Sequence, residues 1–252
     1  MFTIGAGDLD TWLAAFFYPF ARVAALVATA PVLADTAMPQ TIRIGLAFVV
    51  TVVIAPTLAP VAVAPLSAAG VALLVEEILI GTAIGFAMQI AFAAVTMAGD
   101  MIGLQMGLSF ATFVDPEHSE PAPLIGSFLT ILLMLYFLAL NGHLQAIAAL
   151  ADSFRVLPVG ANLRLDDMHA LLAAGAGIFA TGLRIALPVI AAILIANLTL
   201  GMLMRTAPQV NLLAIGFPLT LALGFAVLAL MLPALGPTFD TVIASGLRLI
   251  TR

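Results

Sequence analysis

The sequence is dominated by long runs that contain no charged residue. The shortest of these runs is already about as long as the roughly 20 apolar residues that a helix needs to cross a lipid bilayer. Across the whole chain, 63% of the residues are hydrophobic and only 8% are charged. A soluble domain carries about 25% charged residues, so this composition indicates a membrane protein. The runs are Ile44–Val75, Ile78–Gly99, Pro121–Ala151, Ile185–Met204 and Thr206–Phe239.

Prolines predict where the longest runs break, because proline removes a backbone donor and clashes with the preceding helical turn. In the first run we expect two helices, Ile44–Ala55 and Ala68–Gly99, joined by a proline-rich bend. Lipid cannot satisfy the free backbone groups of such bends. These groups must be buried against protein or face a water-filled cavity. The sequence therefore predicts an all-α fold of membrane-associated helical hairpins with proline-broken helices, and it points to an assembly rather than a lone bundle. In the last run, the expected breaks are at Pro218, Pro233, Gly236 and Pro237.

Glycines recur at helical spacing in two places. Gly99, Gly103 and Gly107 are four residues apart, and so are Gly81 and Gly85. Each glycine costs a helix about 1 kcal/mol relative to alanine, and in membranes such a stripe permits close backbone approach between helices. The residues leave two explanations open, which are packing within the chain and packing against another subunit.

A few ionisable or polar residues interrupt the apolar helices. Glu77 follows one apolar run, and a carboxylate at membrane depth is a functional candidate, although a salt bridge or an interfacial position explains it equally. Asn197, Gly201 and Arg205 share one helix face, and Arg184 lies in another apolar stretch. These side chains fit either an ion path or hydrogen bonds to neighbouring helices.

Signals for an enzyme or a bound cofactor are poor. The chain has no cysteine, and its histidines at 118, 143 and 169 lack metal-ligand spacing. The sequence GAGIFA at 175–180 fits a dinucleotide-binding pattern, but no strand precedes it. Without lysine there is no P-loop. A net charge of −5 argues against nucleic acid, whose phosphates need a basic patch. We expect no catalytic residue, no metal and no cofactor.

Several blocks, taken in order, resemble one family. They read EEILIGTAIGF at 76–86, AGDMIGLQMGLSFATFVDP at 98–116, NGH at 141–143, SFRVLP at 153–158 and NLTLGMLMRTAPQVNLLAIGFPLTL at 197–221. In this order and spacing, the blocks are similar to the FliR family, the flagellar members of the SctT group of type III secretion export-gate proteins. The resemblance covers roughly Glu76 to Phe225.

The resemblance implies a non-enzymatic subunit of the flagellar type III export gate in the bacterial inner membrane, within the flagellar basal body. Proteins of this family join FliP and FliQ around a channel for unfolded flagellar subunits, and FlhB and FlhA are expected as further partners beside membrane lipid. A FliR-like chain resembles a FliP joined to a FliQ. This implies a single helical domain over 1–252 with a FliP-like part at about 1–165 and a FliQ-like part at 166–252.

The resemblance also implies roles for individual residues. Gly103–Pro121 matches the segment that helps plug the closed pore, in which bulky apolar side chains would fill the channel. The plug residues implied are Met106, Gly107, Leu108, Phe110, Phe113, Asp115 and Pro116. The residues implied in subunit packing are Glu77, Gly81, Gly85, Gly99, Gly103, Asn197, Gly201, Arg205, Pro208 and Gln209.

A different class of protein remains as the alternative. A secondary transporter could bind a small solute near Glu77, Arg184 or Arg205, since transporters also use broken helices near the bilayer midplane. The two halves of the sequence show no internal repeat, which such transporters often carry.

Overall fold

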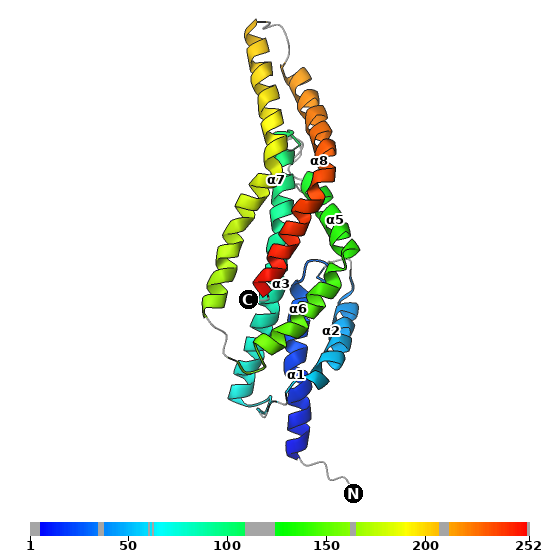
Figure 1. The fold of residues 1–252 in the computed structure, drawn as a ribbon, viewed down its shortest axis with the longest axis vertical. Coiled ribbons are helices and arrows are strands. Elements are labelled where there is room, and N and C mark those ends of the chain that lie inside the picture. The colour runs from blue at the N-terminus through cyan, green and yellow to red at the C-terminus, as the bar shows by residue number, and fades with distance from the viewer. Residues whose placement is uncertain are drawn as a thin grey trace, which may run out of the picture. The chain divides into compact units, whose positions relative to one another are not determined.

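The computed structural model describes residues 6–34, 38–59, 61, 63–108, 124–161, 165–206 and 212–250, and over these residues it is all-helical. The predicted all-α class is confirmed (Figure 1). The helices are α1 (Ala6–Thr29), α2 (Gln40–Ile54), the short 3-10 helix η1 (Ala55–Thr57), α3 (Ala68–Gln105), α5 (Leu124–Ala139), α6 (Gly142–Val156), α7 (Leu165–Thr206) and α8 (Leu212–Ile250).

The proline-rich bend of the first long run is confirmed. Helix α2 ends at Ile54, the 3-10 turn contains Pro56, and α3 begins only at Ala68.

The expected breaks of the last run are wrong, since α8 continues as one helix through its three prolines. Helices of membrane proteins tolerate proline where neighbouring groups or local adjustments satisfy the freed carbonyls. The prolines inside α8 are Pro218, Pro233 and Pro237.

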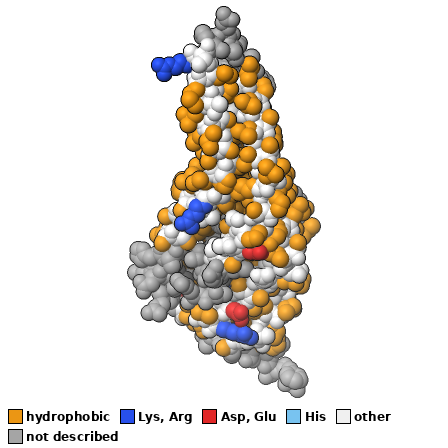
Figure 2. Space-filling model, turned by 45° about the horizontal axis from the view of Figure 1, so that its top comes forward, with side chains coloured by type: hydrophobic (Ala, Val, Ile, Leu, Met, Phe, Trp, Pro, Cys, Tyr) orange, Lys and Arg blue, Asp and Glu red, His pale blue; other side chains and the backbone are white. Residues whose placement is uncertain are grey.

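Many of the helices are long and apolar enough to cross a membrane. Five helices of the described residues meet this condition, or up to six if α5 and α6 count together as one broken span. The break between these two lies at Leu140 and Asn141, where Asn141 takes a left-handed conformation with φ of 55°. Hydrophobic side chains cover most of the face that Figure 2 shows, with only isolated charged groups among them. Such a surface suits lipid or protein neighbours better than water.

The chain forms two compact units, and the long helices α3, α7 and α8 contribute to both. The first unit comprises Met1–Ile90, Leu140–Gly175 and Ile243–Arg252, and the second comprises Ala91–Ala139 and Ala176–Val242. The predicted FliP-like and FliQ-like parts are defined by resemblance to other proteins, whereas the two units are defined by contacts within this chain. The units therefore do not test that division, which stays a prediction.

Candidate functional site

Helix α3 ends in a tight, fully hydrogen-bonded turn at Gly107. Gly107 has φ of 82°, a left-handed conformation that glycine adopts without steric cost. Its N–H donates to the carbonyl of Leu104 at 3.1 Å, and the N–H of Leu108 donates to the carbonyl of Gly103 at 3.0 Å. These two bonds form a Schellman motif. Gly107 therefore permits the tight turn that ends α3, whereas Gly103 stays inside the helix.

Side-chain packing reinforces this turn. A Cβ atom placed on Gly103 would lie 3.9 Å from Cδ1 of Leu108, so the Leu108 side chain folds back over the last helical turn. Leu108 thus occupies the position from which an apolar side chain commonly packs against the helix in a Schellman motif. Met106, one residue before the turn, is fully buried against Gly224 of α8. The start of the predicted plug segment is thus both packed and hydrogen-bonded.

The structure brings three of the seven predicted plug residues together at this turn, namely Met106, Gly107 and Leu108. The other four lie outside the described residues, so their roles stay predictions. They are Phe110, Phe113, Asp115 and Pro116.

In the first unit, the glycines of α3 pack against α1. A Cβ atom on Gly81 would collide with the backbone carbonyl of Arg22, and one on Gly85 would collide with the side-chain oxygen of Thr29. The amide of Gln89 donates to the carbonyl of Thr29 at 2.8 Å, one turn further along. The glycines therefore allow α1 and α3 to approach closely within the chain.

In the second unit, the glycine stripe of α3 meets α5. A Cβ atom on Gly99 would lie 2.5 Å from Cα and 2.6 Å from N of Gly126. The hydroxyl groups of Thr96 and Thr130 share a hydrogen bond of 2.8 Å nearby. At Gly81, Gly85 and Gly99 the structure thus shows packing within the chain, the first of the two explanations that the sequence left open.

Glu77 belongs to a buried ion pair. The guanidinium of Arg22 donates from Nε to Oε2 of Glu77 at 2.6 Å and from Nη2 to Oε1 at 3.0 Å. Its Nη1 donates to the Ser153 hydroxyl at 3.2 Å and to the Leu157 carbonyl at 3.0 Å. The guanidinium also stacks over the Phe154 ring, 4.1 Å from its centroid. Both charged side chains are fully buried, so the pair joins α1, α3 and the end of α6.

Sequence reasoning missed Arg22, the partner of Glu77. One signal was present, because Arg22 is a single cation inside the apolar helix α1 and Glu77 is an acid between two apolar runs. Charges of opposite sign at membrane depth commonly pair with one another. Gly126 and Gly224 were also missed, because neither has a second glycine four residues away that would form a stripe.

The predicted subunit-packing face of α7 is exposed. Asn197, Gly201 and Arg205 are all solvent-accessible in the chain, and no atom lies within 4 Å of a Cβ placed on Gly201. Large apolar neighbours on the same stretch are exposed too, including Leu198 at 67% and Met202 at 66%. The other two predicted packing residues, Pro208 and Gln209, lie outside the described residues.

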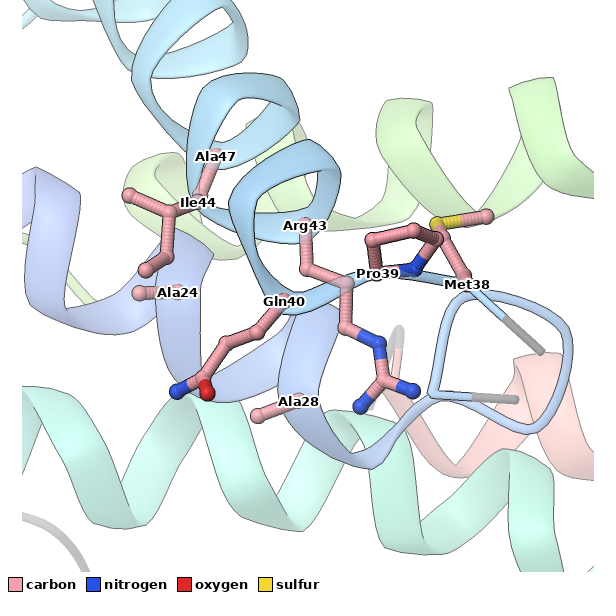
Figure 3. A pocket seen from close by; sticks show the side chains of 8 residues that line it. All are labelled: Ala24, Ala28, Met38, Pro39, Gln40, Arg43, Ile44 and Ala47. Atoms are coloured by element: carbon pink, nitrogen blue, oxygen red, sulfur yellow. The ribbon is translucent and has the colours of Figure 1, made fainter. Parts of the chain in front are cut away.

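A pocket of about 530 Å³ lies between α1 and α2 (Figure 3). Ala24 and Ala28 of α1 line one side of it, and Gln40 and Arg43 of α2 supply most of its polar groups. The pocket contains none of Glu77, Arg184 and Arg205, the residues around which a transported solute was considered. Across the part of the chain that the structure describes, no group of three potential metal ligands comes together.

Comparison with known proteins decides the family. Residues 13–246 match the family of bacterial export proteins, family 1. The flagellar biosynthetic protein FliR of Pectobacterium carotovorum is 47% identical over 241 residues, which cover 94% of this chain and 91% of the relative. The FliR of Escherichia coli is 46% identical over 228 residues, covering 90% and 87%. The chain belongs to the FliR family of bacterial export proteins. The Bacillus subtilis FliR is 30% identical over 218 residues, covering 85% and 84%.

The family resemblance that the sequence motifs carried is therefore confirmed. As a member of the FliR family, the chain is a non-enzymatic component of the bacterial export apparatus. Its candidate membrane spans agree with the inner-membrane location of this family. Membership of an export family leaves the small-solute transporter without support.

Proposed function

We propose that this FliR-family chain forms the channel for unfolded flagellar subunits together with FliP and FliQ, and that the segment from Met106 to Pro116 helps to plug the closed pore. The observation that carries the plug role is the end of α3. Its Schellman turn at Gly107 and the buried Met106 hold the base of the segment firmly. A plug must start from a fixed point if its apolar side chains are to meet in a narrow channel.

The composition of the plug segment supports the same role. Phe110 and Phe113 are bulky and apolar, and they offer no hydrogen bonds to passing cargo. A hydrophobic constriction excludes water and ions by dewetting. In this proposal, Asp115 and Pro116 would end the obstruction and turn the chain back. The closed gate would thus resist ions without binding the polypeptides it exports.

Deleting residues 107–114 tests the plug. We expect gate complexes that assemble with FliP and FliQ but conduct small ions in a planar bilayer. A matched pair of variants refines the test, since Phe110→Ser with Phe113→Ser should leak, whereas Phe110→Leu with Phe113→Leu should stay closed. An assembled deletion complex with the conductance of the native gate would remove the plug role.

The exposed face of α7 supports assembly with other subunits. Asn197 and Arg205 are polar groups on an apolar helix and lie exposed in the chain, and such groups in membrane proteins face protein or a water-filled cavity. Gly201 between them admits a close helix neighbour. We assign this face, with Pro208 and Gln209 beyond it, to contacts with FliP and FliQ, and we expect FlhB and FlhA as further partners in the basal body.

The FliP-like part at 1–165 and the FliQ-like part at 166–252 are included in this proposal. Such a division would let one chain take the places of two neighbours in a ring of related subunits. The long exposed apolar stretches of α7 and α8 support this arrangement, because helices that lie between sister subunits need apolar surface on more than one side.

A further inference from the structure

Met106 occupies a hole on α8 that exists only because residue 224 is glycine. A Cβ atom on Gly224 would lie 2.6 Å from Cγ, 2.8 Å from Sδ and 2.9 Å from Cε of Met106. All three distances are shorter than real side chains adopt, so the methionine fills the space that any other residue at 224 would occupy. Met106 itself is 0% exposed. Methionine suits such an irregular hole because its unbranched thioether is flexible.

The backbone of Met106 is held as well. Its N–H donates to the carbonyl of Ile102 at 2.9 Å, in the last turn of α3. Its own carbonyl lies 3.4 Å from the hydroxyl of Thr220, a buried residue one turn before Gly224 on the same face of α8. The Phe217 carbonyl competes for the single hydrogen of this hydroxyl and lies closer to it, at 3.0 Å. Packing in the hole is therefore the main contact, and the hydroxyl partly satisfies a terminal carbonyl that α3 leaves free.

We infer that the seat formed by Gly224 and Thr220 on α8 positions the base of the plug, with Met106 as the positioning residue. Only Gly107 and Leu108 separate Met106 from the end of the described turn, and both are fixed by hydrogen bonds to α3. A shift of the Met106 backbone would therefore move the point at which the chain leaves the helix. This inference rests on the proposed plug function and adds that α8 sets where the plug starts.

The variant Gly224→Ala tests the seat. The new methyl group would overlap Cγ of Met106 and must displace that side chain. We expect complexes with FliP and FliQ to assemble at the native level and to show a several-fold higher ion conductance in planar bilayers. The matched control is Gly177→Ala, a helical glycine of α7 in the second unit, where a Cβ meets nothing within 4 Å. This control should keep the native conductance.

A second substitution separates positioning from a general structural effect. Met106→Ala removes the three atoms that the Gly224→Ala methyl group would strike, so the double variant should conduct less than Gly224→Ala alone. A general loosening of α8 would leave the double variant as leaky as Gly224→Ala, because exchanging the sizes of the two side chains would not repair it. If Gly224→Ala fails to assemble, Met106→Ala alone replaces it, because truncation creates no clash and should leave an assembled but leaky gate.

The outcomes distinguish the seat from the plug. If deletion of residues 107–114 raises conductance but assembled Gly224→Ala and Met106→Ala complexes stay closed, the seat does not position the plug and the inference is overturned. If the deletion itself leaves conductance unchanged, the proposed function fails first. A further outcome also contradicts the inference. If Gly224→Ala leaks and the double variant with Met106→Ala leaks as much, then the clash between residues 106 and 224 is not the cause of the leak.

Discussion

Arg22 and Glu77 are 55 residues apart in the sequence and form a two-bonded ion pair in which both side chains are fully buried. The planar guanidinium matches the carboxylate geometry, which makes this the stronger kind of charged contact. Its remaining donors reach Ser153 and the Leu157 carbonyl. In a chain with so few charges, this group of contacts connects three helices of the first unit at one defined register.

Glu77→Gln should strongly destabilise the first unit. The substitution keeps the size of the side chain but leaves the buried Arg22 cation without its counter-charge, and breaking such a pair costs roughly 3–5 kcal/mol. We expect a lower thermal midpoint of the purified complex and faster proteolysis in membranes. The double variant Arg22→Leu with Glu77→Leu should be less damaging than Glu77→Gln, since no unpaired charge remains.

An exposed pair provides the control for this prediction. Arg155 and Asp152 are in contact at 3.1 Å, but their side chains are 84% and 56% exposed. Surface pairs contribute little because water and salt screen them. Arg155→Gln should leave the thermal midpoint unchanged. Equal effects of Arg155→Gln and Glu77→Gln would contradict the role assigned to burial.

Gly99→Ala and Gly103→Ala should act in opposite directions, although the two glycines are one turn apart on the same face. At Gly99 the new methyl group meets the backbone of Gly126, which cannot rotate away, and overpacking of this kind costs about 1–3 kcal/mol. At Gly103 the nearest atoms are 3.8 Å away or more, so alanine gains up to about 1 kcal/mol of helix propensity. Thermal unfolding of the two variants checks this, and a stabilised Gly99→Ala would contradict the close packing of α3 and α5.

Gly201→Trp should reduce assembly without unfolding the chain. Gly201 is exposed and open in the chain, so an indole fits there in the absence of partners but would block a close helix neighbour. We expect less FliP and FliQ to co-purify at equal membrane levels of the variant. Thr199→Trp places the same ring on the opposite side of α7, where Thr199 is also exposed. Equal loss of FliP and FliQ in both variants would argue against a specific contact at the Asn197–Arg205 face.

The sequence predicted the fold class, the first proline bend and the family, because these depend on composition, local backbone chemistry and ordered motifs. It did not predict that α8 continues through Pro233, since that depends on what surrounds the freed carbonyls. Nor did it identify Arg22, because a pair 55 residues apart is set by how α1 and α3 meet. The glycine stripe indicated that another helix packs closely against α3, but a stripe does not say which helix this is. Only the structure shows α1 at Gly85 and α5 at Gly99.

The left-handed turn at Gly107 leads to a final prediction, in which alanine and asparagine should differ. With φ of 82°, an alanine at 107 would place its Cβ against the backbone at a cost of about 1–2 kcal/mol. Asparagine tolerates this conformation better, so Gly107→Asn should lose less stability than Gly107→Ala.

A local measurement isolates this turn from the rest of the fold. Hydrogen exchange at the amides of Gly107 and Leu108 reports opening of the two capping bonds, because an amide exchanges when its hydrogen bond opens locally. Exchange should accelerate most in Gly107→Ala, less in Gly107→Asn, and not at all at amides in the middle of α3. Equal protection in the alanine and native chains would mean that the turn does not depend on glycine, and the fixed base assigned to the plug would lose its physical cause.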